Sequence, residues 1–145
     1  MIKFISCSER ETRKLAASFA RKLRGGEVLA LIGNLGSGKT TFVKGLAKAL
    51  GIEARITSPT FVIANRYKVK IGRQQLALHH YDLYPLKRKS ELAELGFGET
   101  LQNPKNIVAV EWPQKALPFL PSRTIYIRFA YGKTPTERIV SFENL

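Results

Sequence analysis

Cysteine, acidic residues and long apolar runs are all scarce in this sequence of 145 residues. The single cysteine, Cys7, cannot form an internal disulfide or build a cysteine cage for zinc. The longest apolar stretch, Val28 to Ile32, is far too short to span a bilayer. Because no long apolar run follows Met1 either, we expect no secretory signal, no membrane association and a cytoplasmic location.

The shortage of acids leaves a large positive charge. Lys and Arg total 24 against 11 for Asp and Glu, which gives a net charge of +13. Such an excess is consistent with a polyanionic partner such as tRNA, or with a basic surface that is merely solvated. The cations are scattered, with small clusters at Arg66–Arg73 and Lys87–Lys89. No aromatic-rich RNA-binding signature accompanies them, so base-specific recognition is not expected.

The apolar pattern predicts one domain over residues 1–145, because strands and helices alternate without a linker or repeat. Ser8 is expected to cap the first helix, with Glu11 completing a capping box, and Gly25 to end that helical region. Further helices are predicted at 40–50 and 90–95. Strands are predicted at 2–6, 28–32, 61–69, 76–81, 107–110, 124–131 and 138–142. Helices alternate with strands in the first part of the sequence, and pairs of consecutive strands come later. This order indicates an α/β fold with a mixed central sheet.

A phosphate-binding loop is the strongest signal. The segment GNLGSGKT, from Gly33 to Thr40, matches G-x-x-x-x-G-K-[ST] between a predicted buried strand and a predicted helix. Glycines allow backbone N–H groups to converge on phosphate oxygens, and the helix N-terminus adds its unpaired donors. We expect Lys39 to reach the outer phosphates and the Thr40 hydroxyl to ligate Mg²⁺. The fold class is therefore predicted to be a three-layer sandwich of the P-loop NTPase type.

Two acids are candidates for holding Mg²⁺ and orienting water. Asp82 is the only aspartate and ends one predicted strand, and Glu111 ends another. Carboxylates at the carboxyl ends of strands face the crevice that holds the phosphate loop. The lack of an Asn-Lys-x-Asp segment removes the usual means of reading guanine, so ATP is favoured over GTP.

Three further segments carry side chains suited to a site. The loop Ser58-Pro59-Thr60 offers hydroxyls for sensing a γ-phosphate, or is a polar connection. Trp112 directly follows Glu111 and is predicted to cover the nucleotide, to contact a partner or simply to be buried. Adjacent residues of a strand face opposite sides, so His79 and His80 diverge, and His80 is expected to hydrogen bond beside Asp82.

Taken together, these motifs resemble a known family. The segments GNLGSGKTTFVKGLAKALG, SPTF, HHYDLY, ELAELGFGE and VEWPQ…LP are similar, in order and spacing, to those of the bacterial TsaE family, also called YjeE. The resemblance runs from about Ser8 to Arg138. It implies a small P-loop ATPase that is needed for threonylcarbamoyladenosine modification of tRNA. Such a protein acts on the TsaB–TsaD heterodimer, while TsaC supplies threonylcarbamoyl-adenylate.

The resemblance also implies roles for individual residues. Thr40, Asp82 and Glu111 would ligate Mg²⁺ directly or through water, and catalysis would rest on Lys39, Asp82 and Glu111. The Ser58-Pro59-Thr60 loop would act as a switch. Nucleotide contacts are expected from Glu9, Thr12, Asn34, Gly36, Ser37, Gly38, Lys39, Thr40, Thr41 and Trp112.

The sequence departs from the family pattern at two places. Pro85 stands where the family usually has arginine, so that role would move to Lys87 or Arg88. The C-terminal turn is expanded, which leaves Lys133 and Arg138 as alternatives for a basic residue near the nucleotide.

The expected function is ATP binding and slow hydrolysis, in which the nucleotide times the action of a partner. Two alternatives stay open from the residues alone. A small-molecule kinase would phosphorylate a metabolite acceptor. A nucleotide-gated RNA-binding module would bind tRNA in a salt-sensitive way without needing hydrolysis.

Overall fold

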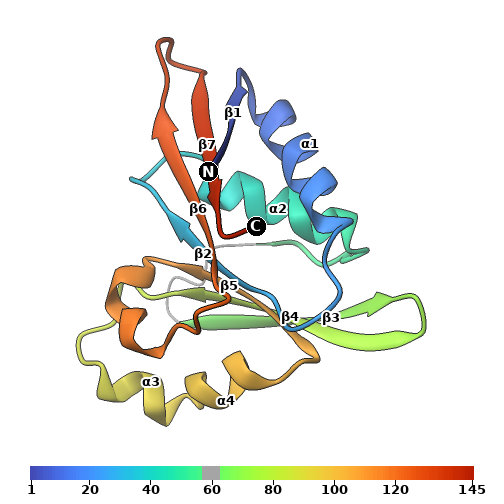
Figure 1. Cartoon of the computed structure of the whole chain (residues 1–145), viewed down its shortest axis with the longest axis vertical. Helices are drawn as coiled ribbons and strands as arrows, with labels where there is room; N and C mark the ends of the chain where they lie inside the picture. The colour runs from blue at the N-terminus through green and yellow to red at the C-terminus, as the bar shows by residue number, and fades with distance from the viewer. Residues whose placement is uncertain (57–62) are drawn as a thin grey trace.

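The computed structural model describes residues 1–56 and 63–145. Its centre is one seven-stranded sheet with the order β1-β7-β6-β2-β5-β4-β3 (Figure 1). The strands are β1 (Ile2–Ser6), β2 (Val28–Ile32), β3 (Ala64–Ile71), β4 (Gln74–Asp82), β5 (Asn106–Glu111), β6 (Ile125–Tyr131) and β7 (Arg138–Glu143). β2 runs parallel to β5 and β6, and β4 runs parallel to β5. The pairs β3–β4, β6–β7 and β1–β7 are antiparallel, so the sheet is mixed as predicted.

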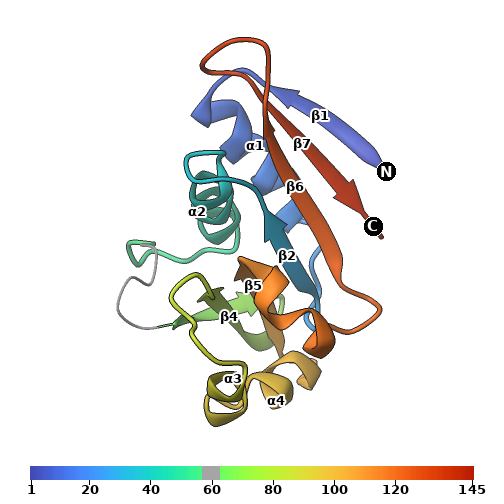
Figure 2. The same ribbon diagram turned by 90° about the vertical axis from the view of Figure 1, so that its left-hand side faces the viewer.

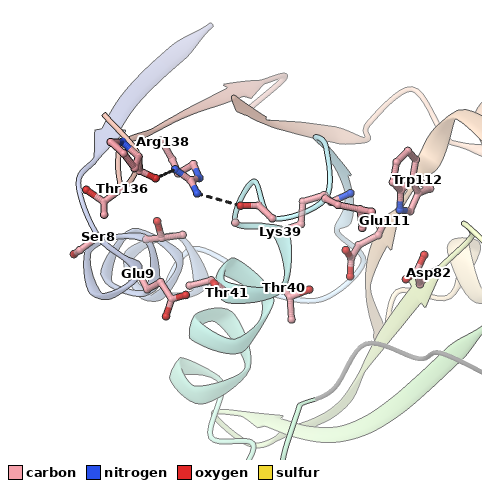
Figure 3. A pocket seen from close by; sticks show the side chains of 15 residues that line it. Ser8, Glu9, Lys39, Thr40, Thr41, Asp82, Glu111, Trp112, Thr136 and Arg138 are labelled. Carbon is pink, nitrogen blue, oxygen red and sulfur yellow. Dashed lines mark hydrogen bonds between the residues drawn. The ribbon is translucent and has the colours of Figure 1, made fainter. Parts of the chain in front are cut away.

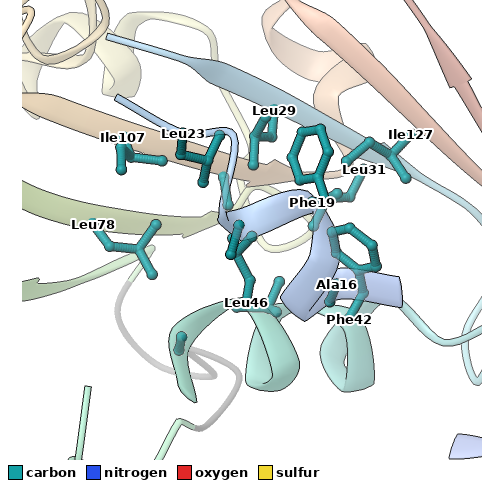
Figure 4. Packing of buried hydrophobic residues seen from close by; sticks show 14 of the residues in the cluster. Ala16, Phe19, Leu23, Leu29, Leu31, Phe42, Leu46, Leu78, Ile107 and Ile127 are labelled. Atoms are coloured by element: carbon teal, nitrogen blue, oxygen red, sulfur yellow. The ribbon is translucent and has the colours of Figure 1, made fainter. Parts of the chain in front are cut away.

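Two helices cover one face of the sheet: α1 (Glu9–Ala20) and α2 (Lys39–Ala49) (Figure 2). The Ser8 cap of α1 is confirmed, and the reciprocal bond of Glu11 goes to the residue before the cap rather than to Ser8. The Glu11 N–H donates to Ser8 Oγ at 3.1 Å, and the Glu11 carboxylate accepts from the N–H of Cys7. Apolar residues of both helices pack on β2, β5 and β6 to form the larger core, in which Phe19, Phe42 and Leu46 are buried (Figure 4).

A second helical layer covers part of the other face. It consists of α3 (Ser90–Glu94), α4 (Phe97–Gln102) and the 3₁₀ helix η1 (Pro113–Phe119). Buried Leu92, Phe97 and Ala116 pack there against Val108 and Val110 of β5. The sequence predicts α3 but neither α4 nor η1. Both are short, and Gly98 in α4 and Pro118 in η1 weaken the local helical signal, so packing on the sheet determines them.

The three-layer α/β sandwich expected from the sequence is therefore confirmed. The hairpin turn near Gly72 is also found where it was predicted, between β3 and β4. The Ser58-Pro59-Thr60 loop and the expected strand start at Phe61 lie outside the described residues. Across residues 1–56 and 63–145, no helix has the length and apolar character needed to cross a membrane.

The strand order determines where a site can form. Because β2, β4 and β5 are parallel, their carboxyl ends meet at one edge of the sheet. The glycine loop leaves β2 at this edge, and Asp82 and Glu111 end β4 and β5 there. In open α/β sheets, ligands bind outside these carboxyl ends.

Candidate functional site

A pocket of about 430 Å³ lies at the carboxyl ends of these strands (Figure 3). It is bounded by the glycine loop and the start of α2 on one side, the start of α1 on another, and the ends of β4 and β5 on a third. The lining residues are Ser8, Glu9, Thr12, Leu35, Gly36, Gly38, Lys39, Thr40, Thr41, Asp82, Glu111, Trp112, Pro135, Thr136 and Arg138.

The glycine loop has the backbone geometry of an anion cradle. Gly38, at the N-cap of α2, has a φ of 112°, a conformation that residues with side chains rarely adopt. A Cβ at Gly33 would lie 2.5 Å from Ser37 Oγ and 2.9 Å from the Phe129 carbonyl oxygen, so only glycine fits. Ser37 Oγ is buried and has no hydrogen-bond partner among the described residues. The glycine loop and the first residues of α2 border the pocket, and a helix N-terminus in this position is suited to bind an anion.

Lys39 lies across the pocket with only 5% of its surface exposed. Its Nζ donates to the carbonyl oxygen of Gly33 at 2.6 Å and sits 4.2 Å from the centre of the Trp112 ring. Burial lowers the pKa of Lys39 from its usual value, while the carboxylates of Glu111 and Asp82 act in the opposite direction. The ammonium group is thus held in the site by a backbone oxygen and an aromatic face, without a salt bridge to either acid within the described residues.

The two acids are direct neighbours in the sheet, because Asp82 and Glu111 face each other in the β4–β5 register. Glu111 is 4% exposed, and its Oε2 lies 2.6 Å from Nε2 of His80, which is fully buried. Asp82 is half-buried and accepts a hydrogen bond from the N–H of Tyr84. Burial raises the pKa of Asp82 first, and the nearby Glu111 carboxylate raises it further.

The hydrogen-bonding role predicted for His80 beside Asp82 is confirmed. Its partner is Glu111 on the adjacent strand, the register neighbour of Asp82. The two histidines do diverge as predicted: His80 is buried, whereas His79 is half-buried and stacks near Tyr81. Within the described residues no cluster of three or more His, Cys, Asp or Glu side chains could hold a metal ion.

Trp112 forms one wall of the pocket in a left-handed backbone conformation, with φ 57° and ψ 52°. This conformation ends β5 and starts η1, and it turns the indole toward Lys39 (Figure 3). The ring centres of Tyr84 and Trp112 lie 4.9 Å apart. Lys115 of η1 donates to the carbonyl oxygens of Tyr84 and Leu86, which fixes the loop after β4 against η1.

The β6–β7 hairpin closes the pocket on the side of α1. The sequence motifs did not decide which basic residue of this hairpin lies near the site. The Tyr131 hydroxyl donates to the carbonyl of Leu35, and the Arg138 guanidinium donates to the carbonyl of Gly36 at 3.2 Å. The same guanidinium stacks 4.8 Å from the centre of the Tyr131 ring. Pro135 of the turn lines the pocket as well. Of the two basic candidates, Arg138 lines the pocket and Lys133 does not.

Most residues predicted to contact a nucleotide do meet at this pocket. Asn34 and Ser37 are exceptions, since neither lines it, and Ser37 is buried beneath the loop. Lys87 and Arg88, considered as substitutes for an arginine at position 85, do not line it either. The predicted residues that do line it are Glu9, Thr12, Gly36, Gly38, Lys39, Thr40, Thr41, Asp82, Glu111 and Trp112.

The donor set fits a magnesium ion that arrives with phosphates. A hydroxyl from Thr40 and carboxylates from Asp82 and Glu111 are hard oxygen ligands, but they are too few to build a metal site without ligand oxygens. Phosphate oxygens in the cradle would supply the missing ligands, so metal and anion would bind together.

The fold and this loop define an α/β protein of the P-loop class. Comparison with known proteins narrows the class. The family model described as "Threonylcarbamoyl adenosine biosynthesis protein TsaE" matches residues 6–140. The chain therefore belongs to the TsaE family, as the motifs in the sequence indicated.

Individual relatives agree with this assignment. The protein named tRNA threonylcarbamoyladenosine biosynthesis protein TsaE in Aquifex aeolicus is 41% identical over 113 residues, which cover 77% of this chain and 76% of the relative. Its namesake in Nostoc is 37% identical over 135 residues, covering 91% and 80%. The crystal structure of Bacillus YdiB superposes with a TM-score of 0.79 at 31% identity, covering 97% of this chain and 83% of that one.

Some relatives are longer. The matched region spans 58% of the Rickettsia conorii protein of the same name, to which it is 40% identical over 108 residues, and 60% of the Rickettsia felis protein.

Proposed function

We propose that this protein binds ATP with Mg²⁺ and hydrolyses it slowly in support of threonylcarbamoyladenosine biosynthesis on tRNA, by acting on the TsaB–TsaD heterodimer. The family and its named relatives support the pathway. The observation that carries the ATPase part is the convergence of Lys39, Asp82 and Glu111 on one phosphate cradle. The nucleotide is then a timing device for a partner rather than a phosphoryl source for a metabolite.

Each side chain has a defined task in this proposal. Lys39 leaves the Gly33 carbonyl and donates to the outer phosphates, where loop amides stabilise the charge that develops during hydrolysis. Thr40 supplies a hydroxyl ligand. The hydrogen bond to His80 orients the Glu111 carboxylate, which can then position a water molecule for attack or contribute to holding the metal ion. Mg²⁺ would neutralise negative charge on the phosphates when bound.

Asp82 has a second, separable task. It is more exposed than Glu111, which suits an outer position toward solvent, and its raised pKa suits it to accept a proton from water there. Asp82 and Glu111 are adjacent carboxylates that could together hold a cation, whose positive charge would offset their mutual repulsion.

Intrinsic turnover is expected to be slow. Among the described residues that line the pocket, Arg138 is the only arginine. Its guanidinium already donates to the carbonyls of Pro135, Glu137 and Gly36. A positive group supplied in trans contributes about 10³–10⁵-fold in related phosphoryl-transfer systems. We therefore expect the partner complex to change the rate.

The test is steady-state ATP hydrolysis by the full chain, with and without the purified TsaB–TsaD heterodimer. We expect slow hydrolysis alone, a changed rate with the heterodimer, and loss of hydrolysis in Glu111→Gln. An unchanged rate with the heterodimer would contradict the partner assignment. Intact hydrolysis in Glu111→Gln would contradict the site. A phosphorylated metabolite found in an acceptor screen would instead identify a small-molecule kinase.

A further inference from the structure

The β3–β4 hairpin carries a row of unpaired positive charges on one face. Arg66, Lys68 and Lys70 alternate along β3 and are all exposed, and Arg73 follows in the turn. Between Glu53 and Asp82 the sequence has no acidic residue at all. In the described structure none of these four side chains makes an ion pair or a hydrogen bond. The row is therefore not neutralised from within the molecule.

The direction of the row follows from the core. Val69 is buried under the α1–α2 layer, and Tyr67 and Ile71 pack against the same cluster. Because successive residues of a strand face opposite sides, Arg66, Lys68 and Lys70 point to the other face. Alternate residues of a strand are about 6.6–6.8 Å apart, so the cations form a regular line rather than a point cluster.

The edge of β3 and the turn end of the hairpin add further donors near the row of cations. β3 is the last strand of the sheet, and no other described strand pairs with its outer edge, which leaves backbone donors on that edge. At the turn end of the hairpin, a hollow of about 480 Å³ is lined partly by Arg73, Lys105, Gln74 and Gln75. Arg73 and Lys105 thus place two further cations around a concave surface at the turn end of the hairpin. The hairpin projects beyond α4, so this end is open (Figure 1).

We propose that this basic face, formed by Arg66, Lys68, Lys70, Arg73 and Lys105, binds the phosphodiester backbone of structured RNA. A line of cations with unpaired donors suits an extended polyanion, and its contacts fix position rather than base identity. Tyr67 packs toward the core, so it offers no platform for stacking a base. The choice of RNA over an acidic protein rests on the proposed function, which makes tRNA the polyanion of the same pathway.

The face is separate from the nucleotide pocket. The turn at Gly72 precedes β4, whereas Asp82 ends it, so the turn and the hollow lie at the opposite end of the strand from the pocket. Removing these charges should leave the phosphate cradle intact. RNA binding and nucleotide binding can therefore be measured independently on the same protein.

The experiment compares two variants of the full chain that each lose four positive charges. The hairpin variant replaces Arg66, Lys68, Lys70 and Arg73 with Gln. The matched control replaces exposed cations of the opposite helical layer with Gln, at Lys14, Lys22, Lys44 and Lys48. Binding of a labelled, unmodified tRNA transcript is followed by fluorescence anisotropy from about 50 to about 200 mM salt. ATP-analogue binding is measured on the same samples.

We expect the wild-type chain to bind the transcript with a steep salt dependence. Each lost phosphate contact lowers the slope of log affinity against log salt by about 0.7–0.9, so the hairpin variant should lose about 3 from that slope. Its affinity at low salt should fall at least about tenfold. The control should lose less than about 1 from the slope, and nucleotide binding should be equal in all three proteins.

The inference would be overturned if the wild-type chain did not bind tRNA, or if both variants lost tRNA binding equally. It would also be overturned if the hairpin variant kept tRNA binding but lost capture of the TsaB–TsaD heterodimer. A fourth contrary result is a hairpin variant that keeps tRNA binding but no longer binds anionic vesicles. The third would identify a protein-docking face and the fourth a membrane-binding face. Absence of nucleotide binding in every sample, with the RNA result as expected, would contradict only the proposed ATPase.

Discussion

At the scale of single residues, the contact between Lys39 and Trp112 provides a direct report on the pocket. Trp112 is the only tryptophan, and the Lys39 ammonium lies 4.2 Å from its ring. A ligand phosphate would draw Lys39 away from Gly33, and the electrostatic environment of the indole would change. Titration with Mg²⁺ and an ATP analogue should therefore shift Trp112 emission saturably. Lys39→Met should abolish the shift, and an equal shift in that variant would contradict this account.

The buried pair of His80 and Glu111 makes a second prediction. Leaving a buried carboxylate without its hydrogen-bond partner costs about 3 kcal/mol. His80→Leu retains side-chain bulk but removes the donor, so urea denaturation should show a loss of about that size. His80→Gln keeps a donor and should lose less. Equal losses in the two variants would mean that shape, rather than the hydrogen bond to Glu111, determines stability here.

The raised pKa of Asp82 predicts how the stability of the fold depends on pH. Its pKa in the folded state is raised, chiefly by burial, above the ordinary value of 3.8. Ionised Asp82 therefore destabilises the fold at pH values above its folded pKa, and this penalty disappears as the pH falls below the unfolded value. Asp82→Asn keeps the acceptor for the Tyr84 N–H and should raise the melting temperature at pH 7 by about 3 °C.

The gain from Asp82→Asn should shrink as the pH is lowered through the raised pKa of Asp82 and below its ordinary value of 3.8, because the wild-type carboxyl then becomes protonated. Thermal melts across this range give the comparison, with Glu99→Gln at an exposed position as a control that should change little. A gain that is independent of pH would show that the carboxylate charge is not its source.

At the scale of elements, the close contact of α1 with α2 depends on Gly45. A Cβ there would lie 2.8 Å from Cα and from the carbonyl oxygen of Arg13, and backbone atoms cannot move aside cheaply. Gly45→Ala should destabilise the fold by about 2 kcal/mol through overpacking. Gly98→Ala in α4 meets nothing within 4 Å and should be neutral or stabilise by up to about 1 kcal/mol. Urea denaturation distinguishes the two, and equal effects would contradict the packing argument.

The elements also show why part of the site could be predicted. The loop from Gly33 to Thr40 is a local motif, and apolar runs that end in Asp82 and Glu111 mark strand ends without knowledge of the fold. The closure by Tyr131 and Arg138 could not be found in this way. Their contacts with Leu35 and Gly36 join residues about a hundred positions apart, and these depend on strand order rather than on local pattern.

The hydrogen bond between His80 and Glu111 also depends on how the strands pair rather than on a local pattern. Both lie in predicted strands, but only the parallel register of β4 with β5 brings them together. The missed helix α4 and the 3₁₀ helix η1 depend on burial of Phe97 and Ala116 against the sheet, which outweighs the weak helical signal of their short segments.

At the scale of the whole molecule, the phosphate pocket lies at the carboxyl end of β4, whereas the basic row runs along β3 from Arg66, opposite His79, to the turn at the amino end of β4. The pocket concentrates three acids, Glu9, Asp82 and Glu111, around Lys39 and Arg138. Before Asp82, the hairpin has no acidic residue, and its Lys and Arg side chains are all positively charged. This separation explains how a chain with a net charge of +13 can keep a carboxylate-rich site for a metal-bound ligand.

The most direct measurement is a crystal structure of the chain with Mg²⁺ and a non-hydrolysable ATP analogue. We predict the triphosphate in the loop of Gly36 to Thr40, Lys39 Nζ on its outer phosphates in place of the Gly33 carbonyl, and Mg²⁺ between the Thr40 hydroxyl and the Asp82–Glu111 pair. An analogue bound elsewhere, or a metal ion held away from both carboxylates, would contradict the account.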